Sequence, residues 1–179
     1  MHQDILEKSG HQLPYFRTSE FSKMMLDSEK MLKDLIGTSK KSKVAFLTAS
    51  GTGAMEASVV GFFTSSDKLL IIVGGSFGKR FSEICDVHGI PHDDLIIPFG
   101  KRMDEGDLLP YINGNYAGML VNIDETSTGQ LYDIHLLSRF CKNKNMFLVV
   151  DAISSFLADS LHMDEDGIDA VIISSQKAL

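Results

Sequence analysis

Two charged side chains in this sequence stand directly behind apolar segments. Asp151 ends the run at 147–150, and Lys177 follows 171–173 after three polar residues. A carboxylate in such a place is costly unless it is paired or hydrogen-bonded, and lysine seldom follows a buried strand so closely. Structurally, Asp151 could cap a helix and Lys177 could extend its stem to solvent. Chemically, they could be a partner for a cation and a desolvated amine that attacks a carbonyl carbon.

A glycine-containing turn, Ser50-Gly51-Thr52-Gly53, is a candidate anion site, because a strand is expected before it and a helix after it. Glycine allows close approach to the backbone, and a helix N-terminus offers unpaired N–H groups and partial positive charge to a phosphate. An ordinary helix cap would use the same residues. The turn matches neither the dinucleotide fingerprint, which needs glycine at Glu56, nor the P-loop, since Ala-Met-Glu replaces its Gly-Lys-Ser/Thr.

Further candidates follow other expected strands. Phe77 comes after Gly-Gly-Ser behind 69–73, where it could anchor a helix in the core or present its ring to a ligand. The polar segment 124–129, Asp-Glu-Thr-Ser-Thr-Gly, follows 117–123. Ligands of open α/β sheets bind outside the carboxyl ends of the strands. These loops together would offer hydroxyls, backbone N–H groups, an aromatic ring, a carboxylate and an amine to one ligand.

Short apolar segments alternate with helical patterns along most of the chain. The expected strands are 44–48, 69–73, 94–98, 117–123, 146–150 and 168–173. The expected helices are one between Thr18 and Gly37, then 54–63, 78–87, 106–112 and 130–142, with a solvated connection at 159–169. Strands that are apolar on both faces and separated by helices indicate an α/β fold: a three-layer α/β/α arrangement around a mostly parallel central sheet, with an N-terminal helical arm.

Composition excludes several classes of function. The net charge of −7 argues against nucleic acid as a partner, and no apolar run approaches the roughly 20 residues of a membrane span. The N-terminus lacks the apolar region of a signal peptide. Cys85, Cys141 and the histidines lack metal-ligand spacing, so we expect no metal and a reduced, cytoplasmic protein.

The order of these motifs resembles the class V, fold-type I aminotransferases, which use pyridoxal 5'-phosphate (PLP). The matching motifs are Ser-Gly-Thr at 50–52, the aromatic after Gly-Gly-Ser, Glu-Thr-Ser-Thr-Gly at 125–129, Val-Val-Asp at 149–151 and Ser-Gln-Lys-Ala-Leu at 175–179. The segment 11–21 is similar to the family's N-terminal arm. The likeness is to the alanine–glyoxylate, serine–pyruvate and 2-aminoethylphosphonate–pyruvate transaminases, and it extends over 10–179.

The resemblance implies a role for each candidate. Lys177 would form the Schiff base with the cofactor and then move a proton between substrate and cofactor carbons. Asp151 would pair with the pyridine nitrogen. Phe77 would stack on the ring, and Thr126 would hydrogen-bond the ring hydroxyl oxygen. The residues that would hold the phosphate are Ser50, Gly51, Thr52 and Gln176.

The implied function is transfer of an amino group from a small amino donor to an oxo acid such as pyruvate or glyoxylate, by a homodimer. Ser174 departs from the glycine that the family often has there. Other PLP chemistry, by a lyase or a desulfurase, is an alternative, although Gln176 stands where a desulfurase would have histidine before the lysine. A truncated, non-catalytic α/β ligand-binding module is another.

Family members continue past the lysine into the rest of the large domain and a small domain. We therefore expect an N-terminal large-domain fragment, with an arm and helix at 1–43, a PLP-binding large domain at 44–179 that is incomplete at its C-terminus, and no small domain. The arginine that grips the substrate carboxylate would lie beyond Leu179. We expect this chain alone to transaminate poorly or not at all.

Overall fold

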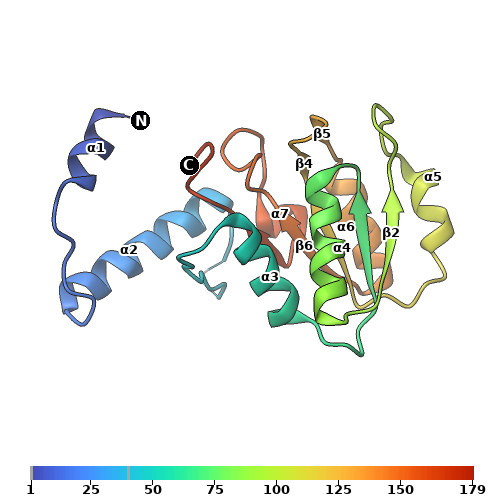
Figure 1. Cartoon of the computed structure of the whole chain (residues 1–179), viewed down its shortest axis with the longest axis horizontal. Helices are drawn as coiled ribbons and strands as arrows, with labels where there is room; N and C mark the ends of the chain where they lie inside the picture. The colour runs from blue at the N-terminus through green and yellow to red at the C-terminus, as the bar shows by residue number, and fades with distance from the viewer. Residues whose placement is uncertain (1, 40) are drawn as a thin grey trace.

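A five-stranded sheet, in which all neighbouring strands are parallel, lies at the centre of the computed structural model, which describes residues 2–39 and 41–179 (Figure 1). Its order is β2-β1-β3-β6-β7, formed by β2 (His92–Ile96), β1 (Leu69–Val73), β3 (Gly118–Asn122), β6 (Phe147–Asp151) and β7 (Ala170–Ile172). A separate antiparallel hairpin joins β4 (Asp124–Glu125) to β5 (Gln130–Leu131). The expected α/β fold with a mostly parallel sheet is confirmed.

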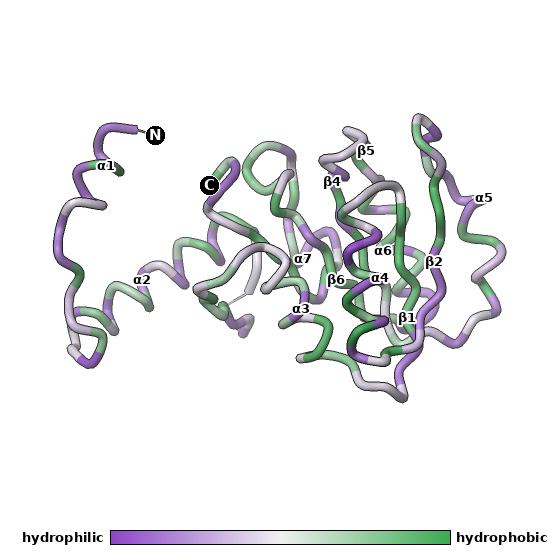
Figure 2. Tube along the Cα trace, viewed as in Figure 1, coloured by the Kyte–Doolittle hydropathy of each residue, from purple (hydrophilic) through white to green (hydrophobic). Residues whose placement is uncertain are grey.

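Apolar side chains from the two faces of the sheet enter two different cores. Because side chains alternate along a strand, Leu69 and Ile71 of β1 pack with α3 (Gly51–Phe62) and α4 (Ser76–His88), whereas Leu70 and Ile72 pack on the side of α6 (Ile134–Lys144) and α5 (Glu105–Leu108). The edge strand β2 is coloured largely hydrophilic in Figure 2, as suits a strand with one unpaired side.

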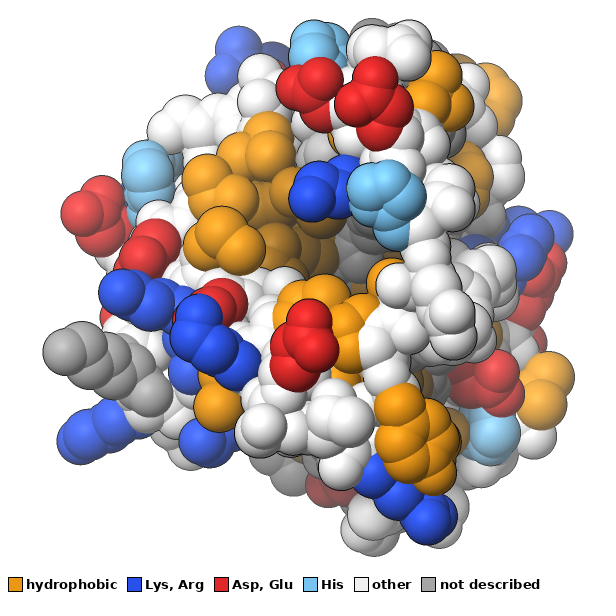
Figure 3. Space-filling view, turned by 90° about the vertical axis from the view of Figure 1, so that its left-hand side faces the viewer, with side chains coloured by type: hydrophobic (Ala, Val, Ile, Leu, Met, Phe, Trp, Pro, Cys, Tyr) orange, Lys and Arg blue, Asp and Glu red, His pale blue; other side chains and the backbone are white. Residues whose placement is uncertain are grey.

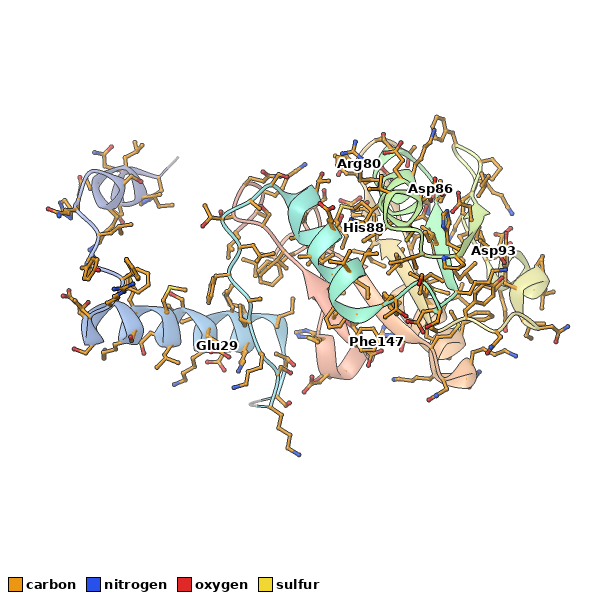
Figure 4. The ribbon with its side chains drawn as sticks, turned by 60° about the horizontal axis from the view of Figure 1, so that its bottom comes forward. Glu29, Arg80, Asp86, His88, Asp93 and Phe147 are labelled. Carbon is orange, nitrogen blue, oxygen red and sulfur yellow. The ribbon has the colours of Figure 1, made fainter. Side chains whose placement is uncertain are left out.

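The N-terminal part extends away from the sheet. Helix α2 (Ser19–Ile36) begins where Thr18 accepts a hydrogen bond from the Phe21 N–H and ends at Gly37 in the left-handed conformation, as its sequence signals predicted. Figure 4 shows α2, with Glu29, running clear of the sheet layers. Helix α1 (Gln3–Ser9) precedes it, was not expected, and has no buried residue. The Thr38 hydroxyl donates to Asp164 at 2.8 Å and so ties the end of α2 to α7 (Met163–Asp166).

The expected strand at 44–48 is wrong. These residues form an irregular segment in which Phe46 and Leu47 are 46% and 51% exposed. An apolar run does not reveal whether a segment has a pairing partner. The edge of the sheet opposite β2 is formed by β7, which pairs with β6.

Other boundaries also differ from expectation: α3 and α4 begin at Gly51 and Ser76, and β2 is shifted to His92–Ile96. Three further differences have clear local reasons. The helix expected from 130 begins at Ile134, because Asp133 caps it and Gln130–Leu131 pairs in the hairpin. The helix expected over 106–112 ends early and continues as a 3₁₀ turn, η1 (Leu109–Tyr111), that contains a proline. The connection expected at 159–169 contains the short helix α7.

Candidate functional site

The carboxyl ends of three strands meet at one edge of the sheet. Asn122 of β3 is in register with Asp151 of β6, which is in register with Ile172 of β7. In Figure 1 the arrowheads of β1 and β2 point toward the same edge, where the β4–β5 hairpin lies. The residues that the sequence selected as candidates lie at the end of β6, in the loops after β4 and β7, and at the starts of α3 and α4.

Asp151 is a carboxylate almost without solvent contact, 1% exposed. Its Oδ2 accepts from Asn122 Nδ2 at 2.9 Å and its Oδ1 accepts from the Ile153 N–H at 3.0 Å. Burial raises the pKa of Asp151 and the Glu125 charge adds to the rise, while the two hydrogen bonds and the charge of Lys177 oppose it. The carbonyl oxygen of the Asn122 side chain, also buried, has no donor among the described residues. This corner of the site is therefore polar and incompletely satisfied.

Lys177 lies in an exposed turn after β7. Its charge lowers the pKa of both Asp151 and Asp124, although burial raises both more strongly. Asp151 is the last residue of β6, and Lys177 lies in the turn that follows the neighbouring strand β7.

The turn at 50–52 approaches the turn that carries Lys177. A Cβ atom added at Gly51 would lie 2.5 Å from Ile153 Cδ1 and 4.0 Å from Gln176 Nε2, so a side chain there would collide with the loop after β6. Ser50 is the N-cap of α3, and its hydroxyl accepts from the Gly53 N–H at 3.3 Å. Helix geometry leaves the first N–H groups of α3 without intrahelical acceptors.

A cation lies beside the same helix start. Arg80 of α4 donates from Nη1 to the Thr52 hydroxyl at 3.4 Å and from Nε to Glu83 at 3.1 Å. Figure 4 labels Arg80 on the helix that packs beside α3. The sequence analysis did not select this residue, because the contact depends on how the two helices pack.

Phe77 lies at the start of α4, and Thr126 lies in the loop after β4. The Phe77 ring, in the first turn of α4, is 39% exposed, more than a core anchor would be. The Thr126 hydroxyl is hydrogen-bonded to that of Ser154, which joins the loop after β4 to the loop after β6. Within the described part of the chain, no group of three or more His, Cys, Asp or Glu side chains could hold a metal ion.

Sequence reasoning gave no individual role to four polar residues of this region besides Arg80, although two of them belong to the motif at 125–129: Asn122, Glu125, Ser127 and Ser154. Asn122 carried a usable signal, since an amide that ends an apolar strand must find a partner. The other three act through contacts between loops, which a linear sequence does not display.

Comparison with known proteins places this arrangement in a family. A family model described as aminotransferase class-V matches residues 6–179. A protein named soluble hydrogenase, small subunit, from Synechococcus sp. is 34% identical over 90% of this chain and 43% of its own length. A 2-aminoethylphosphonate–pyruvate transaminase from Phocaeicola vulgatus is 30% identical over 74% of this chain and 37% of its own. The chain thus spans less than half the length of these curated relatives.

A solved structure agrees with this match. The aspartate aminotransferase of subgroup IV from Thermus thermophilus superposes with a TM-score of 0.90 at 32% identity, over 99% of this chain and 50% of that one. Since the family model covers nearly every residue, the chain belongs to the class V aminotransferases, a family of PLP-dependent enzymes.

Proposed function

We propose that this chain supplies the cofactor-binding part of a transaminase that moves an amino group from a small amino donor to an oxo acid such as pyruvate or glyoxylate. The observation that carries the proposal is the buried Asp151 carboxylate at the end of β6, with Lys177 in the turn after the neighbouring strand β7. The transaminase named among the relatives supports this class of donor and acceptor.

The corner around Asp151 fits a protonated heterocyclic nitrogen. Burial makes the charged carboxylate unfavourable, and a cationic N–H donor would remove that cost and keep its own proton. PLP, when bound, supplies a ring that accepts the electrons left on the substrate carbon. Asp151 would hold that ring protonated, and Asn122 would hold Asp151 in place.

The first turn of α3 fits the phosphate. Ser50, Gly51 and Thr52 would offer N–H and hydroxyl groups there, Gln176 would approach from the turn after β7, and Arg80 would add positive charge. The first turn of α4 is a poorer choice, because its N–H groups already donate to protein side chains.

Three side chains would act on the cofactor ring and the substrate. The Lys177 amine would hold the cofactor through a Schiff base and afterwards take and return the substrate proton. The Phe77 ring would lie against the ring face, and the Thr126 hydroxyl would turn from Ser154 to the ring oxygen.

The finer features of the assembly are also proposed. Residues 1–43 would form an arm that docks on a second copy, while 44–179 would bind the cofactor. Large apolar side chains of α2 are exposed, among them Leu26, Met31 and Leu35, and Figure 3 shows hydrophobic side chains gathered around a hollow on the face that holds α1 and α2. The buried free thiols Cys85 and Cys141 suit the reducing cytoplasm.

The test is covalent capture of the cofactor. The purified chain is titrated with PLP, followed by visible absorbance, reduced with borohydride and digested for mass spectrometry. We expect the label on Lys177, its loss in Lys177→Ala, and its retention in the control Lys144→Ala, which changes an exposed lysine at the end of α6. An unlabelled, colourless chain, or a label spread over surface lysines, would contradict the proposal.

A further inference from the structure

Glu125 is a buried carboxylate whose partners are backbone and hydroxyl groups. It is 1% exposed, and no Lys, Arg or His of the described residues forms an ion pair with it. Its Oε2 accepts from the Gly78 N–H at 2.8 Å, and its Oε1 accepts from the Phe77 N–H at 3.3 Å. The Ser127 hydroxyl donates to the same Oε1 at 2.6 Å.

Ser127 completes the cap on α4. Its hydroxyl oxygen accepts from the Ser76 N–H at 3.0 Å, so Glu125 and Ser127 together take the first three N–H groups of the helix. The N-cap residue, Gly75, has no side chain to offer. A Cβ at Gly75 would lie 2.2 Å from Ser127 Oγ and 2.5 Å from Glu125 Cδ, so glycine leaves the space that these two side chains fill.

This contact joins the loops that carry two candidate cofactor contacts. Phe77 donates to Glu125 through its own backbone N–H, and Thr126 lies between Glu125 and Ser127 in the chain. A shift of the helix start relative to the β4 loop would therefore change the spacing between the Phe77 ring and the Thr126 hydroxyl. A carboxylate at a helix N-terminus also makes strong, charge-assisted hydrogen bonds, which suits it to fix that spacing.

We propose that Glu125 and Ser127 are positioning residues, which hold the Phe77 ring and the Thr126 hydroxyl at the separation that receives the cofactor ring. This inference rests on the proposed function, since it assumes that the ring binds between these groups. The two residues act through α4 and the β4 loop, and they touch neither cofactor nor substrate themselves.

The test measures PLP affinity in three variants of Glu125 and Ser127. Glu125→Gln keeps the shape but turns an amide NH₂ toward backbone N–H groups, and we expect it to weaken PLP binding about tenfold or more, the size of a lost charge-assisted hydrogen bond. Ser127→Ala should weaken binding several-fold, and Ser127→Thr should restore it by returning the hydroxyl. The matched control is Thr128→Ala in the same loop, which removes a hydroxyl that donates to the Glu125 backbone carbonyl at 3.4 Å. This variant should leave PLP affinity unchanged.

Two readouts separate positioning from general loss of structure. The circular dichroism of bound PLP reports the asymmetry of its surroundings. We expect this dichroism to change in Glu125→Gln and Ser127→Ala, while both variants unfold at the same denaturant concentration as wild type. In a Phe77→Ala background, the effect of Ser127→Ala on PLP affinity should shrink, because the ring it positions is gone.

The outcomes distinguish this inference from the proposed function. A wild-type chain that does not bind PLP would overturn the proposed function itself. A wild-type chain that binds PLP, with folded Ser127→Ala or Glu125→Gln variants of equal affinity and equal dichroism, would overturn the positioning role alone. If Glu125→Gln does not fold, Ser127→Ala and its threonine rescue decide the question.

Discussion

At the scale of single residues, Asp151 combines an energetic cost with the function proposed for it. Its side chain is buried among strands, with a raised pKa, and the side-chain carbonyl oxygen of its neighbour Asn122 finds no donor in the part of the chain that the structure describes. Both features are unfavourable for the chain without cofactor, and a cationic ring nitrogen would relieve the first. Residues that oppose stability in the unliganded protein are often the ones that do the chemistry.

Asp151→Asn should therefore separate stability from binding. The new amide can accept from the Ile153 N–H and, after rotation of the Asn122 amide, donate to the Asn122 oxygen. We expect the unliganded variant at pH 7 to be as stable as wild type within about 1 kcal/mol, or more stable, and to bind PLP much more weakly. Urea unfolding and PLP titration measure the two quantities, and a large loss of unliganded stability would contradict the argument.

The same substitution predicts a pH dependence. Because the folded pKa of Asp151 is raised above its ordinary value of 3.8, the folded state holds the proton more tightly than the unfolded state. The stabilising contribution is complete below 3.8 and is lost as pH rises through the folded pKa. As pH rises from 3.8 through the folded pKa, the free energy of unfolding of wild type, measured with urea, should fall relative to that of Asp151→Asn. The same pH dependence in both proteins would show that folding does not raise the pKa of Asp151.

How far the sequence reveals this site depends on the kind of residue. Asp151 and Lys177 break apolar runs, so their positions alone mark them as unusual. Glu125 sits in a polar loop of similar residues, and its burial becomes visible once the loop folds over the start of α4. Arg80 resembles any surface arginine until two helices bring it to Thr52.

At the scale of elements, close packing of α4 on the sheet depends on one glycine. A Cβ at Gly78 would lie 2.4 Å from the Ile72 carbonyl oxygen, which is backbone and cannot rotate away. Gly61 in α3, by contrast, has nothing within 4 Å of its Cβ position. Two helical glycines with opposite surroundings provide an internal comparison.

Gly78→Ala should destabilise the fold by about 1–3 kcal/mol, because the helix must move off the strand. Gly61→Ala should be neutral or stabilise by up to about 1 kcal/mol, because alanine restricts the unfolded chain and favours helix. Urea unfolding of the two single variants measures both. Equal effects of the same sign would mean that contact with Ile72 does not govern the packing of α4.

Elements were predictable where periodicity and caps agreed. Thr18 and Gly37 mark both ends of α2, and the continuous apolar run at 69–73 becomes a strand buried on both faces. The failure at 44–48 has the opposite cause: the segment has strand-like composition, but strand formation needs a hydrogen-bonding neighbour. Neither the pairing of β4 with β5 nor the strand order is encoded in local spacing, since both depend on contacts between segments distant in sequence.

At the scale of the whole molecule, the two thiols report on opposite faces of the sheet. Cys85 belongs to the core under α3 and α4, and Cys141 to the core under α6. Burial raises the pKa of each thiol to about 12, so almost no thiolate is present near neutral pH, and thiolate is the reactive form. Alkylation should then require opening of the fold.

We expect both cysteines to resist iodoacetamide at pH 8 and to become labelled together as urea unfolds the chain, followed site by site by mass spectrometry. Coincident labelling would show that the two cores unfold as one unit. Native labelling of either thiol at the rate of a small-molecule thiol would show that its core opens independently. None of the helices in the described residues is long and apolar enough to cross a bilayer.

The turn at 50–52 and Gln176 are distant in sequence and meet in the folded chain. A phosphate cradle built from both, as proposed, would form when β7 has docked beside β6. Before that step a folding chain would present the first turn of α3 alone. Loading of the vitamin B6 derivative would therefore follow the docking of β7 during biogenesis.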